Sequence, residues 1–470
     1  MAIASPTTDQ KLIPGPRRLP GAAAYWRYFQ FFRDPLRMIR QHYAHYGALS
    51  GIFNSFEAGQ PGTLLAIGPQ YNQLLLSDPQ TFYSPDLAER KGGVMERLST
   101  GLVFENGDRH RQHRRLVMPA FHKKHIEGYR DDMVALTERM LAGWQVGSVR
   151  DMKHDMHELT MHVANKTLFG LDTVEGNLGE LIARWLAQIV NPLGRLLPYD
   201  LPGSPQRKLK RLSQELEKQI SAVIARKRQQ LGNDVLSTLL QTHDENGAAL
   251  TDDEVLGQTN ILFIAGHETS ANTLTWALFM LAQHPRVLAA VREEIDGVLG
   301  GQAPTVEQLG QLQLLERVIK ETLRLMPPLT WTLRTAQQPF EIGPYSMPAQ
   351  TTVFYSHFMT HRLPELYEQP ERFMPERWQT INPSPYEYIP FSGGPRLCIG
   401  ATFAMMEMKI VLPMILQRFS LSLLPDAHID YQVLPTLTVK KGLPMLVQPH
   451  GTRVEKVAVQ GTVREMVMLA

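Results

Sequence analysis

One cysteine occurs in the 470 residues of this chain, and it lies in a glycine-rich segment, Phe391-Ser-Gly-Gly-Pro-Arg-Leu-Cys-Ile-Gly400. A single cysteine excludes an intrachain disulfide and every zinc or iron-sulfur site that needs several thiolates. The glycines permit positive φ and close backbone approach, so N–H groups can point at the sulfur, and a helix is expected to begin near Ala401. Such N–H groups and the helix dipole lower a thiol pKa. Any thiolate chemistry therefore depends on Cys398.

A second group of polar residues interrupts the longest apolar helix pattern. That pattern, residues 251–284, opens with the capping-box sequence Thr251-Asp-Asp-Glu254 and is apolar on most sides, which predicts a helix through the centre of the protein. Its middle is Ala265-Gly266-His267-Glu268-Thr269. Glycine costs about 1 kcal/mol in a helix, and threonine competes for backbone carbonyls. Taken alone, the group favours a kinked core helix over a functional site.

The elements that must position these residues are mainly helical. A proline-rich lead-in, residues 1–34, is expected to be extended because proline fixes φ and lacks an N–H donor. Residues 63–68 and the segments 331–358 and 421–448 have the pattern of short strands. The fold class is therefore mainly α with a smaller antiparallel β region. The helical segments expected from 3.6-residue spacing are residues 35–48, 128–146, 151–168, 178–194, 206–231, 251–284, 312–325 and 400–419.

Composition indicates a globular protein, with 43% hydrophobic and 20% charged residues. No linker-like segment divides residues 35–450, so we expect a single domain there, followed by a tail of unknown structure at 451–470. A net charge of +2 does not indicate a nucleic-acid partner. The chain has neither an apolar run of about 18 residues nor a signal-peptide pattern, which predicts a cytoplasmic protein without a membrane anchor.

The cysteine segment matches the haem-binding signature F-x-x-G-x-R-x-C-x-G of the cytochrome P450 superfamily at Phe391, Gly394, Arg396, Cys398 and Gly400. The chain resembles soluble bacterial-type members of that superfamily from residue 14 to about residue 448. The resemblance implies the cytochrome P450 fold, with haem b (iron protoporphyrin IX) between the long central helix and the cysteine-loop helix. Cys398 would be the axial thiolate ligand.

The same resemblance implies roles for the other motifs. Thr269 would hydrogen-bond dioxygen or its water above the haem, Glu268 would help to relay protons, and the helix would bulge locally there. Glu321 and Arg324, an ordinary surface pair by spacing alone, would form a buried structural network with Arg377 that locks the proximal loop. Four residues would bind the haem propionates: His110, Arg114, Arg334 and Arg396. His110 stands where many family members carry tryptophan. Further haem contacts would come from Phe391, Ala265, Gly266 and Gly400. The expected substrate pocket comprises Leu262, Ala265, Leu329, Trp331 and Leu437.

The implied function is a monooxygenase that uses dioxygen as co-substrate to hydroxylate or epoxidise a lipophilic molecule of the fatty acid, terpenoid or steroid class. The chain has no G-x-G-x-x-G turn and no length left for a flavin domain, so electrons would come from a separate ferredoxin or flavodoxin and its reductase. A basic stretch is the expected docking surface for this donor, and the protein is expected to be a monomer. The stretch contains Arg109, Arg111, Arg115, Lys123 and Lys124.

Three alternatives differ in chemistry: a peroxide-driven peroxygenase, a haem-thiolate isomerase or dehydratase, and a non-enzymatic haem sensor. The first would usually lack the acid–alcohol pair Glu268 and Thr269, and the second would tend to lose Thr269, whereas both residues are present. The sensor would not require a substrate cavity. All three rank below the monooxygenase.

Overall fold

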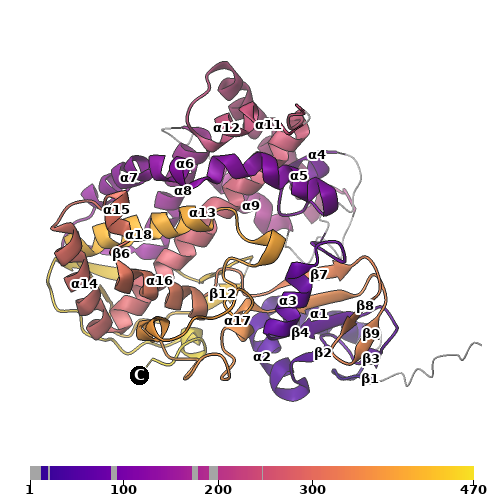
Figure 1. The fold of residues 1–470 in the computed structure, drawn as a ribbon. Helices are drawn as coiled ribbons and strands as arrows, with labels where there is room; N and C mark the ends of the chain where they lie inside the picture. The colour runs from indigo at the N-terminus through magenta and orange to yellow at the C-terminus, as the bar shows by residue number, and fades with distance from the viewer. Residues whose placement is uncertain are drawn as a thin grey trace, which may run out of the picture. The chain divides into compact units, whose positions relative to one another are not determined.

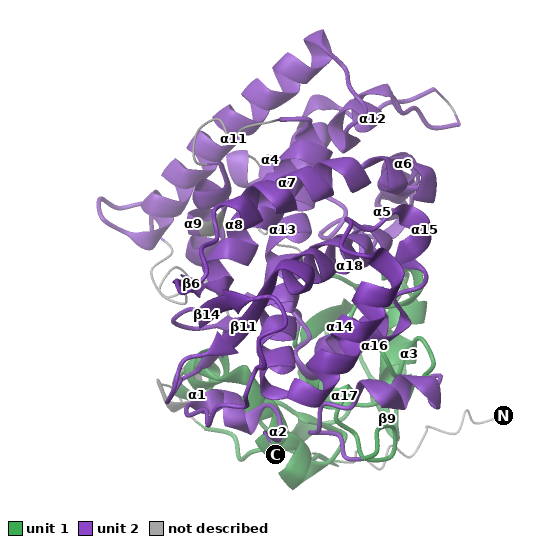
Figure 2. Cartoon of the chain, turned by 90° about the vertical axis from the view of Figure 1, so that its left-hand side faces the viewer, with its two compact units in different colours: residues 1–85, 330–368, 383–397 green, residues 86–329, 369–382, 398–470 purple. Residues whose placement is uncertain are grey.

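The computed structural model describes residues 12–19, 22–85, 93–171, 178–189, 199–245, 247–433 and 435–469. The chain divides into two compact units, each assembled from three separate segments (Figure 2). Unit 1 comprises residues 1–85, 330–368 and 383–397, and unit 2 comprises residues 86–329, 369–382 and 398–470. Residues 1–11 of the expected lead-in and Ala470 of the expected tail lie outside the described part. A single domain over residues 35–450 stays a prediction.

Unit 1 is built around a five-stranded sheet with the order β2-β4-β10-β7-β5. β4 and β10 pair in parallel, with Thr63 opposite Thr352, whereas the other neighbours in this sheet are antiparallel. The strands of the expected antiparallel β region therefore pair antiparallel except for β4 and β10. Parallel neighbours need a long connection, and a local strand pattern does not show which distant strand will pair.

The described elements of unit 1 are four α-helices, nine strands and one 3₁₀ turn. They are α1 (Ala22–Arg33), α2 (Pro35–Tyr46), α3 (Pro69–Ser77), α17 (His357–Thr360), β1 (Leu12–Ile13), β2 (Leu49–Gly51), β3 (Phe56–Glu57), β4 (Thr63–Ala66), β5 (Phe82–Tyr83), β7 (Thr332–Ala336), β8 (Phe340–Ile342), β9 (Tyr345–Met347), β10 (Thr352–Tyr355) and η3 (Gly394–Arg396).

The extended N-terminal segment is shorter than expected. β1 is extended and pairs with β3, but Ala22–Arg33 form the helix α1. The prediction of an extended segment up to residue 34 was therefore wrong for about its last third. The helix-breaking prolines end at Pro20, and the alanines that follow favour a helix. α2 ends before Gly47, whose φ of 78° stops the helix as its spacing predicted.

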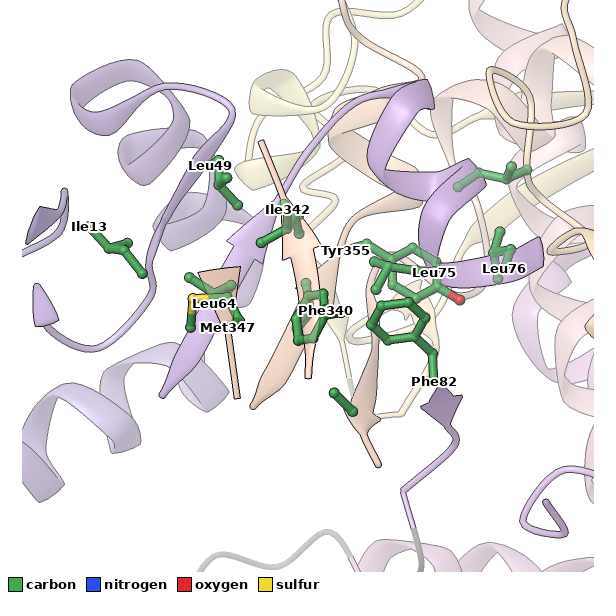
Figure 3. Close-up of a cluster of buried hydrophobic side chains, with 14 residues drawn as sticks. Ile13, Leu49, Leu64, Leu75, Leu76, Phe82, Phe340, Ile342, Met347 and Tyr355 are labelled. Carbon is green, nitrogen blue, oxygen red and sulfur yellow. The ribbon is translucent and has the colours of Figure 1, made fainter. Parts of the chain in front are cut away.

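The core of unit 1 lies where the sheet meets α3 and the β8–β9 hairpin (Figure 3). Phe82 and Phe340 pack edge to face there, with ring centroids 4.9 Å apart. Val353 and Tyr355 of β10 are both fully buried, two residues apart, as expected for side chains that share one face of a strand. This apolar layer holds the strand that carries Arg334 in place.

Unit 2 is mainly helical (Figure 1). Its described helices are α4 (Val94–Ser99), α5 (Gly107–Val117), α6 (Lys123–Gly128), α7 (Arg130–Ala142), α8 (Met152–Phe169), α9 (Leu178–Ile189), α11 (Pro205–Gln229), α12 (Val235–Gln241), α13 (Asp252–Gln283), α14 (Pro285–Leu299), α15 (Val306–Leu309), α16 (Gln313–Leu325) and α18 (Ala401–Arg418), with 3₁₀ turns η1 (Met118–Phe121), η2 (Pro375–Gln379) and η4 (Thr462–Glu465). Its strands are β6 (Val149–Asp151), β11 (Phe419–Leu423), β12 (Tyr431–Val433), β13 (Leu437–Val439) and β14 (Pro444–Pro449).

The 32-residue helix α13 is the central element of unit 2. Thr251 and Glu254 form the expected capping box, in which each side chain accepts from the other's backbone N–H. Beyond its first turn the helix is buried almost throughout, and it packs against α4, α8, α16 and α18. The close approach to α4 is possible because Gly257 has no side chain there.

The C-terminal residues 451–469 pack into unit 2. His428 and Gln460 form a parallel bridge, Val463 and Met466 are fully buried, and the N–H of Met468 donates to the carbonyl of Glu371. Among the described helices, none combines the length and the apolar character needed to cross a membrane.

Gly257→Ala should destabilise the protein although alanine is the better helix former. A Cβ at this position would collide with the carbonyl oxygens of Thr100 and Arg97 in the backbone next to it. We expect a loss of roughly 1–3 kcal/mol, measured as a lower thermal midpoint. The matched control is Gly297→Ala in α14, where a Cβ meets nothing within 4 Å and propensity should add about 0.5–1 kcal/mol. Equal shifts in both variants would show that the packing at Gly257 is not limiting.

Candidate functional site

Cys398 is the first residue of the last segment of unit 2, three residues before α18 begins at Ala401. Its side chain is accessible from outside the chain. Protein nevertheless surrounds the sulfur closely enough for burial to dominate its pKa. The two observations are compatible, because a side chain is accessible when solvent can reach it from one side. The pKa depends instead on how much protein surrounds the sulfur on all sides.

Burial raises the pKa of the Cys398 thiol, while the backbone N–H of Gly400 and the charge of Arg114 lower it. The two lowering influences are those expected for this loop, but the expected net fall was wrong because desolvation outweighs them. Gly394 alone among the three loop glycines has a positive φ, at 58°, and a Cβ there would collide with the carbonyl oxygen of Leu76. Gly393 and Gly400 have negative φ.

Arg114 of α5 is suited to bind a carboxylate that comes from outside the protein chain. Its guanidinium is half-buried, and no carboxylate among the described residues pairs with it. Burial lowers its pKa, and the charge of Cys398 raises it. His110, one turn earlier, is buried on the same helix. A half-buried cation of this kind suits an anionic group supplied from outside the protein chain.

Arg334 and Arg396 lie in unit 1 and share a neighbour. Both lower the pKa of the Tyr355 hydroxyl, although burial has the larger effect and raises it. Arg334 is buried, donates to the Leu333 carbonyl at 2.8 Å, and lies with its guanidinium carbon 5.6 Å from the centroid of the Tyr355 ring. No carboxylate in the described part of the chain pairs with Arg334. Phe391 is also in unit 1 and is half-buried.

The middle of α13 is accessible although most of the helix is buried. Ala265 is exposed, and Gly266 and Thr269 are partly exposed, between the buried residues Phe263 and Ser270. The helix is α-helical throughout this stretch, so the expected local bulge is absent. The Thr269 hydroxyl donates to the carbonyl of Ala265 at 2.9 Å, one turn earlier. Backbone and hydroxyl therefore form one accessible polar face at the centre of the helix.

Glu268 points into a polar chain that sequence analysis did not find. The Thr436 hydroxyl donates to Glu268 Oε1 at 2.7 Å, and Asn272 Nδ2 donates to Thr436 Oγ1 at 2.9 Å. His157 Nε2 lies 3.2 Å from Asn272 Oδ1. Burial raises the pKa of Glu268, while the Thr436 hydroxyl and the charge of Lys153 lower it. These partners are distant in sequence, and no local pattern could have identified them.

Glu321 is the acceptor of the expected structural network. Arg324 donates to both of its carboxylate oxygens at 2.9 Å, and Arg377 Nε donates to Oε1 at 3.0 Å. The indole of Trp378 and the backbone N–H of Met374 donate as well, at 3.0 and 2.9 Å. Glu321 and Arg324 are fully buried, and the network ties α16 to residues 369–378. Trp378 was not predicted as a member, although it follows Arg377 directly.

A second buried carboxyl, Glu407 of α18, was not singled out from the sequence. Burial raises its pKa to about 8, and neither of its oxygens has a hydrogen-bond partner in the described residues. The Ser270 hydroxyl lowers the pKa of Glu407, but it does not reach hydrogen-bond geometry with either carboxylate oxygen. Glu407 is thus mostly protonated at neutral pH.

The expected pocket residues have different surroundings. Ala265 and Leu329 of unit 2 are exposed, as an accessible wall requires. Leu437 is fully buried and Leu262 almost so, which is typical of core positions. Trp331 of unit 1 stacks on Phe354 at 5.2 Å within an aromatic cluster. The structure therefore leaves Ala265 and Leu329 as the accessible members of this set.

The basic stretch on α5 and α6 is less available than its sequence indicated. Arg109 pairs with Glu105 and Glu254, Arg111 with Asp108, Arg115 with Glu245, and Lys123 with Glu127. Two of these acids, Glu245 and Glu254, come from a segment about 130 residues or more further along the chain. Four of the five cations therefore have acidic partners within the chain, and the docking of an electron donor on this stretch stays a prediction.

Comparison with known proteins decides the family. The family model described as Cytochrome P450 matches residues 16–446, which is most of the chain. The protein is a cytochrome P450. Its sequence is 33% identical over 413 residues to cyclooctat-9-en-7-ol 5-monooxygenase of Streptomyces melanosporofaciens, covering 84% of this chain and 86% of that relative. It is 31% identical to cyclooctatin synthase of the same organism, covering 89% and 92%.

A solved structure supports the same fold. Retinoic acid-bound cyanobacterial CYP120A1 matches with a TM-score of 0.83 and 25% sequence identity, covering 94% of this chain and all of that chain. This P450 is accordingly an oxidoreductase of the monooxygenase type. Membership of the family implies haem with a cysteine thiolate ligand and the use of dioxygen.

The residues present fit such a haem. Cys398 is accessible and is the lone cysteine of the chain, so it would supply the axial thiolate. Arg114, in the same unit as Cys398, is a half-buried cation that lacks a carboxylate partner within the described ranges, and it would bind a propionate. Arg334 of unit 1 is a buried cation that also lacks such a partner there. Gly400 leaves space beside the sulfur, since a Cβ there would lie 4.0 Å from Cys398 Sγ.

Glu321→Ala or Arg324→Ala should lower the stability of this P450 by about 3–5 kcal/mol. Either change leaves the remaining charges buried without their partner. Thermal unfolding of the purified protein measures the loss, and the yield of haem-loaded protein should fall with it. The control is Arg115→Ala, which breaks an exposed pair with Glu245 and should change stability by less than about 1 kcal/mol. Similar midpoints for all three variants would contradict the network.

Glu407→Gln should flatten the pH dependence of stability. The folded-state pKa of about 8 exceeds the ordinary value of 4.5, so between these values the native state binds a proton that the unfolded state lacks. Stability is therefore retained below about pH 4.5 and falls as the pH rises towards 8, by up to roughly 5 kcal/mol. Thermal unfolding from pH 5 to pH 8 should show a smaller decline in the variant. The exposed control Glu245→Gln should show the same decline as the wild type. A decline in Glu407→Gln as large as that of the wild type would contradict this role.

Proposed function

We propose that this P450 hydroxylates or epoxidises a lipophilic cyclic terpenoid, with electrons from a separate redox protein. The observation that carries the proposal is the accessible centre of α13, where the Thr269 hydroxyl donates to the carbonyl of the exposed small residue Ala265 and Glu268 directly precedes Thr269 in the sequence. An apolar surface beside a hydroxyl and an acid can hold a lipophilic molecule and deliver protons to the same place.

The haem, when bound to Cys398, supplies the activation of dioxygen, which thiolate electron donation favours. The protein side chains supply protons. Thr269 holds a hydroxyl proton that now points at the Ala265 carbonyl, and rotation about χ1 would turn it away from the helix axis. Glu268 holds or releases its proton at the carboxyl whose Oε1 is fixed by Thr436. Because burial raises its pKa, Glu268 can carry a proton closer to neutral pH than an exposed glutamate.

The names of the relatives favour a terpenoid over a fatty acid or steroid. Cyclooctat-9-en-7-ol, named as the substrate of one relative, is a carbocyclic alcohol with a C=C bond. Accessible Ala265 and Leu329 suit a carbocyclic, mostly apolar molecule, since both offer apolar surface without charge.

A ferredoxin or flavodoxin with its reductase is the proposed electron source, and the protein is proposed to act as a cytoplasmic monomer. Because most cations on α5 and α6 have acidic neighbours, the docking energy should depend less on that stretch than its sequence alone indicated. The acid–alcohol pair Glu268 and Thr269 favours the dioxygen-dependent reaction over a peroxide-driven one.

The substrate class can be tested by titrating the ferric protein with cyclic terpenoid alcohols, fatty acids and steroids. We expect terpenoids to produce the largest shift from low spin to high spin, and to be oxidised only when dioxygen and a reduced ferredoxin are both supplied. Turnover with hydrogen peroxide alone at a comparable rate would favour the peroxygenase. Product formation without dioxygen would favour the isomerase, and a spin shift without any product would favour the sensor.

Thr269→Ala should uncouple the reaction by about tenfold, measured as product formed per reducing equivalent consumed. The change removes the hydroxyl on the accessible face of α13, and haem content and substrate binding should stay normal. The matched control is Thr273→Ala, one turn later, whose hydroxyl makes the same kind of bond to the Thr269 carbonyl at 2.9 Å. Equal coupling in the two variants would show that the Thr269 hydroxyl does not deliver protons in this reaction.

A further inference from the structure

The side chains of Thr436, Asn272 and His157 form a continuous hydrogen-bond chain that ends on Glu268. Its three links measure 2.7 Å from Thr436 to Glu268, 2.9 Å from Asn272 to Thr436, and 3.2 Å between His157 and Asn272. Three elements contribute: α13 carries Glu268 and Asn272, α8 carries His157, and Thr436 lies directly before β13. The inner members are buried and His157 is half-buried.

The donors and acceptors of this hydrogen-bond chain are arranged in one direction. Thr436 donates to the carboxyl, and Asn272 donates to Thr436 with its Nδ2, so Asn272 Oδ1 is left to accept from His157 Nε2. Every donor thus points towards Glu268, which is the arrangement that an ionised carboxylate needs. Burial lowers the pKa of His157 to about 4, so this ring is neutral near pH 7 and carries one proton on Nδ1 or Nε2.

We propose that Thr436, Asn272 and His157 are positioning residues whose hydrogen-bond chain can reverse, so that Glu268 keeps a partner with or without its proton. This inference rests on the role of Glu268 proposed above. In the reversed state the protonated carboxyl donates to Thr436 Oγ1, Thr436 donates to Asn272 Oδ1 after the amide rotates, and Asn272 Nδ2 donates to His157 Nε2. No member of the chain is left unpaired in either state.

No net proton passes through the amide in this reversal. Glu268 exchanges its proton on its other side, and Asn272 only rotates. His157 loses the proton from Nε2 and gains one at Nδ1, which its partial exposure allows through water. The reversal therefore changes neither the net charge nor the number of protons on the three side chains. The hydrogen-bond chain stabilises both the protonated and the ionised form of Glu268.

The other charged groups near the chain also bear on Glu268. Lys153 of α8 favours its ionised form and donates at 2.6 Å to the carbonyl of Val439. Lys153 and His267 disfavour a charge on His157, whereas Asp151 favours it. His267 itself is buried, with Nδ1 placed 2.9 Å from the Phe263 carbonyl. None of these groups forms a link of the chain.

The first experiment measures the protonation of Glu268 in the holoenzyme by infrared difference titration, with the carboxyl band assigned by its loss in Glu268→Gln. Thr436→Val should raise the pKa of Glu268, because the Thr436 hydroxyl bonds the ionised carboxylate more strongly than the protonated carboxyl. Thr436→Ser should keep the wild-type value. The matched control is Thr438→Val, two residues along, whose buried hydroxyl has no hydrogen-bond partner among the described residues. Equal titration midpoints for Thr436→Val and Thr438→Val would overturn the proposal.

A double-mutant cycle tests transmission along the chain. Asn272→Leu alone should shift the Glu268 midpoint in the same direction as Thr436→Val but by less, and it should add nothing in the Thr436→Val background. Two independent, additive shifts would show that Asn272 acts on Glu268 by another route. If Thr436→Val yields too little protein, Asn272→Asp replaces it, because an acceptor-only side chain would draw the Thr436 hydroxyl away from Glu268 and raise the same midpoint.

The reversal itself has a spectroscopic signature. In the diamagnetic ferrous carbon-monoxide form, ¹⁵N NMR of labelled histidine, assigned by His157→Phe, should show the proton moving from Nε2 to Nδ1 as Glu268 becomes protonated. One tautomer across the whole titration would overturn the reversal.

Turnover separates this inference from the proposed function. Coupling should fall about two- to tenfold in Thr436→Val and stay normal in Thr436→Ser and Thr438→Val. A shifted Glu268 midpoint with unchanged coupling would support the chain and contradict the proposed role of Glu268. Lost coupling with an unchanged midpoint would overturn the chain and leave the proposed function standing.

Discussion

The polar side chains of α13 are hydrogen-bonded to segments that surround the helix in unit 2. Gln258 accepts from the backbone of Leu102, Asn260 donates to Leu98, Trp276 donates to Leu437, and Gln283 donates to Val457. A buried helix that slid or rotated would leave these groups unpaired, at a cost of about 1–3 kcal/mol each. The accessible stretch around Ala265 is therefore fixed by contacts at both ends of the helix, and the other elements of unit 2 are set in register against it.

Three glutamates in unit 2, the buried Glu321 and Glu407 and the half-buried Glu268, show how the surroundings of a carboxyl determine its role. Glu321 accepts from two guanidinium groups, an indole and a backbone N–H, and it holds a segment in place. Glu407 has no hydrogen-bond partner in the described residues, and burial raises its pKa. Glu268 lies between these extremes, with one hydroxyl donor and a distant lysine opposing the effect of burial. The hydroxyl donor and the lysine therefore support the ionised form of Glu268 while burial favours its protonated form.

Local sequence patterns predicted the helices well but could not identify partners that meet only in the folded protein. The capping box at Thr251 and the helical spacing around α13 depend on neighbouring residues, so both were predictable. Thr436 and Trp378 reach Glu268 and Glu321 from more than 50 residues away, and no periodicity indicates such contacts. The thiol pKa was misjudged for the same reason, since desolvation of Cys398 depends on the whole surrounding structure. α1 was not predicted because the extended conformation that prolines impose was assumed to continue beyond Pro20.

The parallel pairing of β4 with β10 has a consequence for synthesis of the protein. The two strands are separated by roughly 290 residues, yet they are neighbours in the sheet of unit 1. At about 5–20 residues per second, a ribosome needs roughly 15 to 60 s to produce β10 after β4. During that interval the early strand has one exposed edge, and an unpaired edge can pair with another chain. Chaperones that shield nascent strands should therefore matter more for the yield of this protein than for that of a protein whose sheets form from consecutive strands.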